Sequence, residues 1–463
     1  MTRIMDLRTQ EEVIRALKMG EMKLAVMGLG WMGLPTACLY AKAGVHVIGI
    51  DISEDVVKAI NSGRCHLEAE PELKALVKEL VSRGTLRATS DVIEGLRRSD
   101  VVIVVVPTLI KEGKPDYSAL TKAAEDLGNA MKPGSLIIVE STVGPGVTEG
   151  LFARRIQEIG GLRPGVDYGL AYSPIRAMAG RALRDIQNYP RILGAVDERS
   201  FLVAEGVLRI IVKGGIVGVS NIMTAEAVKL AENVYRDVNI ALVNELAKLF
   251  ERIGVDVYEV IRAANTQPYA HLHIPGIGVG GHCIPVNPYF LLDVANSHGI
   301  ELKLVKEARR VNDSMPDHTI SLLTRALRRT GRRLSDVKVA ILGLSYRGNV
   351  KEHRYSPTLR LYELLKGRAR EVVIYDPYYT AEELERLGLR GTDTLEDAVK
   401  GASCIIIATD HDAFRRLDFR AIARLANEGA VLLEGRPVID RPEVVVSSGL
   451  RYVGIGRPAT WIR

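Results

Sequence analysis

Short apolar runs alternate with segments of helical character in the first part of the chain. Residues 23–27 form a run too short for a helix, and a glycine-rich stretch and a helical segment come after it. Residues 45–50 form the next apolar run and end at Asp51, and further strand candidates lie at residues 101–106 and 136–139. This alternation is typical of a doubly wound parallel sheet.

One long helix is predicted in the middle of the chain. From Thr224 to about Phe250 the apolar residues recur at helical spacing, and no glycine or proline interrupts them. A helix of about 27 residues would span roughly 40 Å, which is longer than most helices within a domain. A core helix and a connecting helix that also forms a dimer seam are both compatible with this pattern.

A second series of apolar runs begins near Ser335 and repeats the rhythm of the first. Strands are expected at residues 337–342, 372–375, 404–408 and 430–433. The predicted fold class is therefore α/β, with two doubly wound Rossmann-like domains joined by a long central helix and a helical middle domain.

These patterns divide the chain into residues 1–220, 221–320 and 321–463. The first division is the expected NAD-binding Rossmann domain, and the second is a helical domain suited to dimerisation. Residues 343–348 keep only part of a dinucleotide-binding fingerprint. The third division is therefore expected to bind something else, such as a nucleotide.

Composition and charge limit the class of protein and of substrate but predict no further helix or strand. Of 463 residues, 47% are hydrophobic and 25% charged, which is ordinary for a globular protein of several folding units. The net charge is 62 − 56 = +6 without a long basic run. A nucleic-acid binder would concentrate such charge, so a small polyanionic substrate fits better.

The four cysteines and the N-terminal segment indicate the expected compartment. Cys38, Cys65, Cys283 and Cys404 lie far apart and form no CxxC pair, so neither disulfides nor a metal site are expected. Residues 1–22 lack the apolar core of a signal peptide, and no stretch approaches the roughly 20 apolar residues of a membrane span. A cytoplasmic location is expected, with neither membrane nor nucleic acid as a partner.

Gly28, Gly30 and Gly33 form a GxGxxG motif after a strand and at the start of a helix. The first glycine permits the tight turn, the second admits a pyrophosphate, and the third allows helix and strand to pack closely. Asp51 ends the next strand, where a carboxylate can accept hydrogen bonds from ribose hydroxyls and would repel a 2′-phosphate. The motif therefore favours NAD over NADP.

The stretch from Pro275 to Pro285 has four glycines within six residues and ends with His282 and Cys283. Such a stretch suits neither a helix nor a strand, and it is interpreted as a loop whose backbone comes close to a ligand. A lone cysteine is usually a buried hydrophobe, but in this setting a nucleophile is favoured.

With this loop, the chain resembles the UDP-glucose/GDP-mannose dehydrogenase family over nearly its whole length. The family usually reads GGHCIPxDPYxL around its catalytic cysteine. The other motifs that carry the resemblance are Glu140-Ser141-Thr142-Val143 with Pro145-Gly146, residues 225–233 with Tyr235-Arg236-Asp237, Arg354 before Ser356-Pro357, Tyr375-Asp376-Pro377, and Thr409-Asp410-His411.

The resemblance implies oxidation of a CH₂OH group to a carboxylate with two NAD, an activity of nucleotide-sugar metabolism and polysaccharide biosynthesis. One hydride transfer cannot take an alcohol to an acid. A thiolate at Cys283 would trap the intermediate aldehyde as a thiohemiacetal, which yields a second hydride and becomes a thioester that water cleaves. Lys229 and Asn233, four residues apart on one helix face, could stabilise the negative oxygen of each intermediate. Thr142 would hold a water near the reacting carbon.

The site residues expected from motif and resemblance fall into three sets. The catalytic set is Cys283, Lys229, Asn233, Thr142 and Asn287. The NAD-binding set is Gly28, Gly30, Trp31, Met32, Gly33, Asp51, Pro107, Thr108 and Thr142. The substrate-binding set for a UDP-sugar is Arg176, Lys229, Asn233, His273, Gly280 and Arg354, and a homodimer through the central helix is expected.

Three positions depart from the family's pattern. Asn287 stands where relatives carry an aspartate four residues after the cysteine, and Ile175 stands where they carry a glutamate. An amide can orient a neighbouring group but takes no proton at neutral pH, and isoleucine can do neither. Hydrolysis of the thioester is therefore hypothesised to be slow or to use another group. Pro268-Tyr269 replaces a Pro-Arg pair whose arginine reaches a neighbouring subunit's substrate in relatives.

The substrate is inferred from resemblance alone. Residues 173–181 resemble the version found in enzymes of UDP-N-acetylhexosamines, and the spacing from Pro268 to Pro275 with His273 resembles the N-acetylmannosamine branch. The first hypothesis is thus oxidation of UDP-N-acetyl-D-mannosamine to its uronate, with UDP-glucose or UDP-N-acetylglucosamine as alternative substrates. A nucleotide-sugar-binding protein impaired in catalysis and a dehydrogenase that stops at the aldehyde are the other hypotheses. The number of NADH released per sugar separates the hypotheses. Two NADH are expected for oxidation to the uronate, one for the dehydrogenase that stops at the aldehyde, and none for the binding protein.

Overall fold

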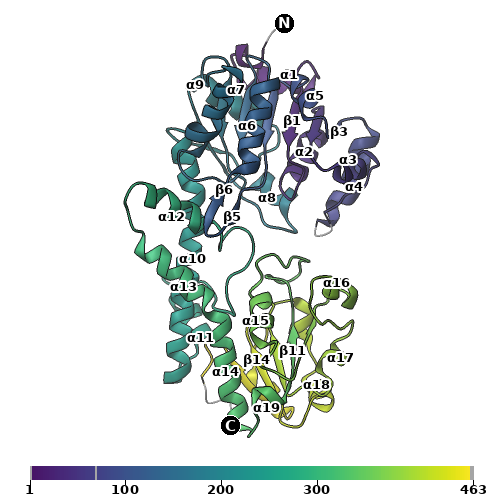
Figure 1. Ribbon diagram of the computed structural model, residues 1–463, viewed down its shortest axis with the longest axis vertical. Coiled ribbons are helices and arrows are strands. Elements are labelled where there is room, and N and C mark those ends of the chain that lie inside the picture. The colour runs from purple at the N-terminus through teal and green to yellow at the C-terminus, as the bar shows by residue number, and fades with distance from the viewer. Residues whose placement is uncertain (1–2, 68–69, 459–463) are drawn as a thin grey trace. The chain divides into compact units, whose positions relative to one another are not determined.

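The computed structural model describes residues 3–67 and 70–458. The contacts between its residues divide the chain into two compact units. The first consists of Met1–Glu232 with Tyr289–Ile300, and the second of Asn233–Pro288 with Glu301–Arg463. Each unit contains one large sheet with helices on both faces (Figure 1).

The first unit contains an eight-stranded sheet in the order β10-β9-β8-β7-β4-β1-β2-β3. Neighbouring strands are parallel except for β8 and β9. The chain reverses its direction of sheet growth between β1 and β4, which is where such sheets bind ligands. The strands are β1 (Leu24–Met27), β2 (Val47–Ile50), β3 (Leu86–Thr89), β4 (Val101–Val104), β7 (Leu136–Val139), β8 (Gly169–Tyr172), β9 (Arg191–Ala195) and β10 (Ile216–Gly218).

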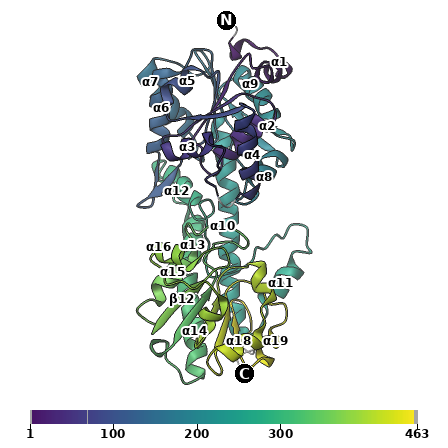
Figure 2. The same cartoon turned by 90° about the vertical axis from the view of Figure 1, so that its right-hand side faces the viewer.

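Two sets of helices cover this sheet, as Figure 2 shows. Both faces are covered, so β1, β4 and β7 are buried along their whole length and the sequence shows them as unbroken apolar runs. One face carries α1 (Gln10–Lys18), α2 (Gly33–Lys42), α4 (Pro71–Ser82), α8 (Ala182–Asn188) and α9 (Glu198–Arg209), and the other carries α5 (Val92–Arg97), α6 (Ser118–Ala130) and α7 (Arg154–Gly160), while α3 (Glu54–Asn61) packs beside β3.

The predicted strands of this unit are confirmed with small differences in length. Of the run at residues 101–106 only the part up to Val104 is strand, and Val105 lies beside Gly28. A hairpin of β5 (Leu109–Lys111) and β6 (Lys114–Asp116) comes next, which the sequence pattern does not predict. Its short, exposed strands carry no apolar run, so only contacts with the rest of the fold specify them.

The long helix is confirmed as α10 (Ile222–Ile253), with 32 residues against the roughly 27 expected from residues 224–250. Its residues up to Glu232 belong to the first unit and those from Asn233 to the second. The shorter helices after it are α11 (Val257–Ala264), α12 (Asn287–Ser297), α13 (Lys303–Asp313) and α14 (Met315–Arg329). None of the helices described for this chain combines the length and apolar character of a membrane span.

The second unit contains a five-stranded parallel sheet in the order β12-β11-β13-β14-β15. Helices α14 and α15 lie on one side of it and α17 and α18 on the other (Figure 1). The strands are β11 (Lys338–Leu342), β12 (Glu371–Tyr375), β13 (Cys404–Ile407), β14 (Val431–Glu434) and β15 (Arg451–Gly454), and the helices are α15 (Pro357–Leu365), α16 (Ala381–Arg386), α17 (Leu395–Val399), α18 (Phe419–Leu425) and α19 (Pro442–Ser447).

Four of these strands match the predicted runs, and β15 lies outside them. The fold class of two doubly wound sheets with helices between them is confirmed. The second sheet has the strand order of the flavodoxin-like class, with its change of direction between β11 and β13.

Candidate active site

The glycine turn of the first unit connects β1 to α2. Gly28 has a φ of +93°, and its N–H donates to the Ile50 carbonyl at 2.8 Å. A Cβ on Gly33 would overlap the carbonyl oxygen of Gly28, so this position requires glycine for helix packing. Around an ideal Cβ on Gly30, by contrast, no heavy atom of the described chain other than those of Gly30 and its two neighbours lies within 4 Å. Glycine at position 30 leaves space that a bound group can enter.

Asp51 closes this turn from the end of β2. Its carboxylate accepts the Leu29 N–H at 2.8 Å and the Ser53 N–H at 2.9 Å while remaining partly exposed. Carboxylate oxygens have further lone pairs, so it can still accept hydrogen bonds from ribose hydroxyls. The open space at Gly30 and this acceptor fit an NAD molecule, which supplies a hydride acceptor when bound.

The other residues expected at the cofactor lie around the same turn. Trp31 and Met32 are half-buried and pack against the core on the α2 side of the sheet. Pro107 and Thr108 lie just beyond β4, the strand paired with β1, with Pro107 exposed and Thr108 half-buried. All four therefore belong to the loops at the switch point of the first sheet.

Thr142 lies in the turn after β7, which a buried glutamate from α10 holds in place. Glu226 accepts the Gly146 N–H at 2.5 Å and the Thr148 N–H at 2.8 Å. Burial raises the pKa of Glu226, and these hydrogen bonds lower it. Burial has the larger effect, so the pKa is raised to about 7. Thr142 itself is half-buried, so its hydroxyl sits at a fixed turn that is partly open to solvent.

Lys229 and Arg176 meet the segment around Ile175 in the first unit. The Lys229 ammonium donates to the Ile175 carbonyl at 2.7 Å. The Arg176 guanidinium pairs with Glu232 and also donates to the Pro190 carbonyl at 3.0 Å. The Ile175 side chain is buried in the core, so at this position the protein presents a backbone carbonyl in place of a carboxylate.

The glycines of the second motif allow their loop to pack closely against its own unit. A Cβ on Gly278 would lie 2.8 Å from Pro357 Cβ, and a Cβ on Gly280 would lie 2.5 Å from Tyr346 Cβ and 2.8 Å from the Tyr355 carbonyl oxygen. Side chains there would collide with the loop between β11 and α15, which accounts for the glycines.

Amides on α10 fix both ends of the segment that leads into this loop. Asn244 accepts the Gly276 N–H at 3.1 Å and donates to Asn312 of α13 at 2.9 Å. Asn239 accepts the His273 N–H at 2.8 Å and donates to the His271 carbonyl at 2.7 Å. The segment that leads into the glycine loop is thereby held by hydrogen bonds to side chains of α10.

Cys283 is half-buried at the end of this loop, just before α12. Its carbonyl accepts the N–H of Asn287 at 2.8 Å, so the chain already turns toward the helix at the cysteine. The side chain of Asn233 donates from Nδ2 to Oδ1 of Asn287 at 2.5 Å, and both amides are buried. Asn287 thus lies beside Asn233, and it offers an amide nitrogen where a carboxylate would offer a second oxygen.

His282, Glu352 and Arg354 lie together in the second unit. Arg354 donates to both carboxylate oxygens of Glu352, with distances of 2.6–3.1 Å. Burial opposes the charge of Glu352, but hydrogen bonds from Arg354 hold the pKa of Glu352 below its usual value. Burial and the Arg354 charge lower the pKa of His282, so its imidazole is neutral at neutral pH.

His273, the remaining expected substrate residue, packs edge-on against Tyr235 with ring centroids 6.2 Å apart. Burial lowers the pKa of His273, and the charge of Arg236 adds to this effect. The structure therefore gathers Cys283, Asn233, Asn287, Gly280, His273 and Arg354 in the second unit, and the NAD residues with Thr142, Arg176 and Lys229 in the first.

Tyr346 is a residue near the cysteine that the motifs do not identify. It lies four residues after β11, in the stretch that keeps only part of the dinucleotide fingerprint. Its ring packs against Gly280 and Gly281, and it interacts electrostatically with Cys283. The partial fingerprint is a signal that this turn has another purpose, but the sequence does not show that it contacts the cysteine loop.

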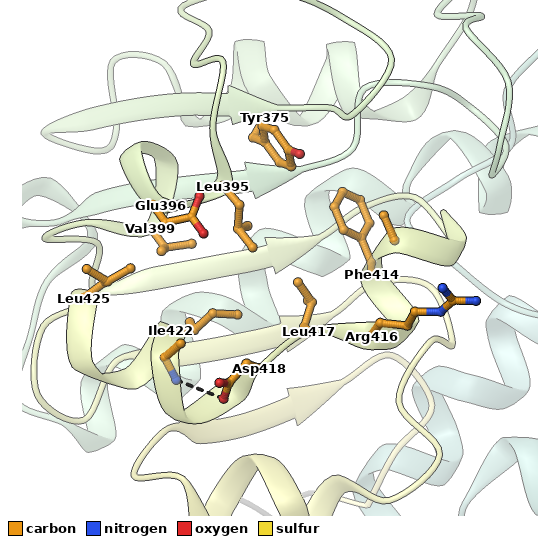
Figure 3. A pocket seen from close by; sticks show the side chains of 12 residues that line it. Tyr375, Leu395, Glu396, Val399, Phe414, Arg416, Leu417, Asp418, Ile422 and Leu425 are labelled. Carbon is orange, nitrogen blue, oxygen red and sulfur yellow. Dashed lines mark hydrogen bonds between the residues drawn. The ribbon is translucent and has the colours of Figure 1, made fainter.

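A cleft of about 230 Å³ opens elsewhere on the second unit (Figure 3). Residues from the end of β12, from α17 and from α18 line it, among them Tyr375, Leu395 and Ile422. None of the expected catalytic or binding residues is among those that line it.

Models of three domains of one family match the chain. The UDP-glucose/GDP-mannose dehydrogenase NAD binding domain matches residues 22–212, the central domain 223–314, and the UDP binding domain 340–441. UDP-N-acetyl-D-mannosamine dehydrogenase of Pyrococcus horikoshii is 42% identical over 94% of this chain and 99% of its own length. The enzyme of that name from Methanocaldococcus jannaschii is 35% identical over 94% and 96%.

A solved structure of UDP-D-ManNAc dehydrogenase from Pyrococcus horikoshii has the same fold. It superposes with a TM-score of 0.87 at 42% identity and covers 94% of this chain and 99% of its own. With NAD as the cofactor of its first domain, the chain belongs to the UDP-glucose/GDP-mannose dehydrogenase family of NAD-dependent nucleotide-sugar dehydrogenases.

Proposed function

We propose that the protein oxidises UDP-N-acetyl-D-mannosamine at C6 to UDP-N-acetyl-D-mannosaminuronate with two NAD. The observation that carries this substrate is the similarity to two archaeal enzymes named for it, over nearly the full length of all three chains. UDP-glucose and UDP-N-acetylglucosamine are the alternative substrates.

In this proposal Cys283 is the nucleophile. Its thiolate adds to the aldehyde formed by the first hydride transfer, and the resulting thiohemiacetal loses a second hydride to give a thioester. Lys229 and Asn233 stabilise the oxygen anion of each intermediate, and Thr142 holds the water that cleaves the thioester. The half-buried position of Cys283 supports this role, because the thiol is accessible yet attached to a loop fixed by α10.

The remaining site residues hold the two ligands. Gly28, Gly30, Gly33 and Asp51 bind NAD together with Trp31, Met32, Pro107 and Thr108. Arg176, His273, Gly280 and Arg354 contact the UDP-sugar. We also propose three domains, with residues 1–220 for NAD, 221–320 for dimerisation and 321–463 for the UDP-sugar, in a cytoplasmic enzyme.

Hydrolysis of the thioester is proposed to be the slow step. Ile175 and Asn287 supply no carboxylate, and loss of a positioned general base typically costs about 10²–10⁴-fold in rate. Asn287 still accepts the hydrogen bond from Asn233, so it keeps the geometry but takes no proton. A rapid-quench experiment read by mass spectrometry should detect an acyl-enzyme on Cys283. Fast turnover without that adduct would contradict the proposal.

The substrate is tested by NADH release against a panel of UDP-sugars. We expect the highest kcat/KM with UDP-N-acetyl-D-mannosamine, and no NADH from the Cys283→Ser variant. A higher kcat/KM with UDP-glucose would replace the proposed substrate with the alternative. Unchanged turnover in Cys283→Ser would contradict the proposed chemistry.

An exposed apolar stripe on α10 supports a homodimer through this helix. Tyr235, Leu242 and Leu249 recur every seven residues and are 53%, 48% and 51% exposed. Spacing of this kind is typical of helices that pair along their length. Leu242→Glu should give monomers in analytical ultracentrifugation, whereas Val444→Glu on α19, at an equally exposed residue, should not. A dimeric Leu242→Glu would contradict this interface.

A further inference from the structure

A row of buried side chains connects α13 to the start of the glycine loop in the second unit. Asn312 of α13 donates from Nδ2 to the backbone carbonyl of Asp237 at 2.9 Å and to its carboxylate at 2.8 Å. Oδ1 of Asn312 accepts from Asn244 at 2.9 Å, and Oδ1 of Asn244 accepts the Gly276 N–H at 3.1 Å. Asp237, Asn244 and Asn312 are each at most 1% exposed, so solvent has little access to these hydrogen bonds.

The row has a fixed direction, because its two ends allow only one orientation of the amides. An asparagine amide can be placed either way round, with its oxygen and nitrogen exchanged. The backbone carbonyl of Asp237 can only accept, so the nitrogen of Asn312 must face it and the oxygen must face Asn244. The N–H of Gly276 can only donate, so the oxygen of Asn244 must face it. Both ends thus impose the same arrangement, with every donor opposite an acceptor.

A buried ion pair holds the end of the row that is far from the loop. Arg309 is 4% exposed, donates to the Asp237 carboxylate at 2.5 Å and also pairs with Asp313. Asp237 and Asn244 lie seven residues apart on α10, which is about two helical turns, and both bond to Asn312 of α13. The side chain of Asn244 is therefore tied to a second helix as well as to its own.

Gly276 is the point at which this row meets the loop that leads to Cys283. The N–H of Gly276 is buried, so it needs an acceptor, and Asn244 provides one. A Cβ on Gly278, two residues later, would lie 3.5 Å from the backbone carbonyl oxygen of Asn312. The first part of the loop thus lies against the same two helices that carry the row.

We propose that Asp237, Asn312 and Asn244 are positioning residues that hold the loop of Cys283 in place through this one-way row of hydrogen bonds. Cys283 comes seven residues after Gly276, and no helix or strand lies between residues 264 and 287. The position of the thiol therefore depends on the points at which the loop is held. This role rests on the nucleophilic role of Cys283 in the proposed function.

Hydrogen–deuterium exchange of the whole protein measures how firmly Gly276 is held. Deuterium uptake of peptides that cover residues 276–284 is read by mass spectrometry, without sugar or NAD. Asn244→Ala removes the acceptor of the Gly276 N–H, and Asn312→Leu removes the preceding partner while leaving Asn244 in place. Loss of one buried hydrogen bond should make uptake about fivefold faster in each variant.

The double variant distinguishes a connected row from two independent contacts. In a connected row Asn312 acts on Gly276 only through Asn244, so the double variant should take up deuterium no faster than Asn244→Ala alone. Independent effects would multiply to about 25-fold. Thr319→Val is the matched control, because it removes a buried hydroxyl of α14 that donates to the Met315 carbonyl at 2.8 Å. This control should leave uptake at residues 276–284 unchanged.

Two further readouts connect the loop to Cys283. Alkylation of Cys283 by iodoacetamide at constant pH should be about fivefold faster in both single variants, because its half-buried thiol becomes accessible when the loop opens. Cys65, which is half-buried in the first unit, is the internal reference. With UDP-N-acetyl-D-mannosamine, kcat should fall about tenfold because the thiol is displaced, whereas the KM for NAD should stay unchanged.

Unchanged uptake at residues 276–284 in folded Asn312→Leu would overturn the proposal, and so would effects that multiply in the double variant. Unchanged alkylation of Cys283, or an unchanged kcat, would overturn the positioning of the thiol. If Asn312→Leu does not fold, Asn312→Ser decides by the same readouts. Uptake and alkylation need no sugar, so failure of the wild type to yield NADH with every UDP-sugar counts against the proposed function alone.

Discussion

The two sheets begin with the same turn and use it differently. In each sheet the strand β1 or β11 is followed directly by a glycine with positive φ, +93° at Gly28 and +103° at Gly343. The N–H of each glycine donates to the last residue of the neighbouring strand, Ile50 at 2.8 Å and Tyr375 at 2.7 Å. The local geometry of the turn is thus shared.

An aspartate after the second strand completes the likeness. Asp51 accepts the Leu29 N–H at 2.8 Å, and Asp376 accepts the Leu344 N–H at 2.7 Å. Asp376 also accepts the Ser345 N–H at 3.1 Å, and it is buried against His411. In the second sheet the carboxylate is therefore saturated by the protein.

The two turns diverge in the residues after the glycine. After Gly28 the helix begins at Gly33, and the space beside Gly30 is open. After Gly343 the helix begins only at Pro357, and Ser345 is buried at the position that corresponds to Gly30. One turn leaves room for a dinucleotide, whereas the other extends into a loop that packs on the glycines before Cys283. The same turn can therefore occur in two sheets without binding the same ligand.

The largest expected effect separates the two aspartates. Asp376→Asn leaves buried donors around His411 unsatisfied and should lower the free energy of unfolding by about 3 kcal/mol without changing NAD affinity. Asp51→Asn should weaken NAD binding about tenfold and change stability little, because Asp51 is partly exposed. Chemical denaturation and calorimetric NAD titration measure the two effects. Equal effects of both variants on stability would remove the distinction.

A pH titration distinguishes the buried carboxylates of the two units. Glu226, with a pKa raised from 4.5 to about 7, binds its proton more tightly in the folded state than in the unfolded state. Stability should therefore fall as the pH rises from 4.5 to about 7, by up to about 3 kcal/mol.

Asp376 behaves in the opposite way. Burial raises its pKa, but His411 and the backbone N–H groups hold it below 3.8, so its contribution is present above that pH and lost in acid. Denaturation at several pH values gives the free energy of unfolding as a function of pH. Between pH 4.5 and about 7 this free energy should change less with pH in Glu226→Gln than in the wild type. The same slope in both would show that Glu226 is not the titrating group.

Two alanine variants in the turn between β1 and α2 have the smallest expected effects on stability. The two variants should nevertheless differ clearly from each other. Gly33→Ala forces a Cβ into the Gly28 carbonyl and should cost about 1–3 kcal/mol of stability. Gly30→Ala meets open space, so it should leave thermal unfolding nearly unchanged while weakening NAD binding. Loss of stability in Gly30→Ala would mean that the space beside Gly30 is not available to a ligand.

The parts of the fold with local signals can be predicted from the sequence. GxGxxG, Asp51 and α10 depend on neighbouring residues, and each lies where it is expected. Strands β3, β8, β9, β10 and β15 escape prediction, because short or mixed runs become strands only by pairing with distant partners.

Some contacts among the candidate site residues agree with the sequence patterns, whereas the surroundings of these residues do not follow from them. Cys283, Asn233 and Asn287 lie together, and Lys229 lies beside Ile175. The packing of Gly280 on Tyr346 joins residues 66 positions apart, and the hold of Asn244 on Gly276 joins residues 32 apart. Contacts of this range depend on the tertiary fold, and no local pattern encodes them.

The number of NADH released per sugar is the decisive measurement for the proposed four-electron oxidation through Cys283. With limiting UDP-N-acetyl-D-mannosamine and excess NAD, we expect two NADH for each uronate found by mass spectrometry, and none with Cys283→Ser. One NADH per sugar with an aldehyde product, or two NADH in the absence of the Cys283 thiol, would contradict this mechanism.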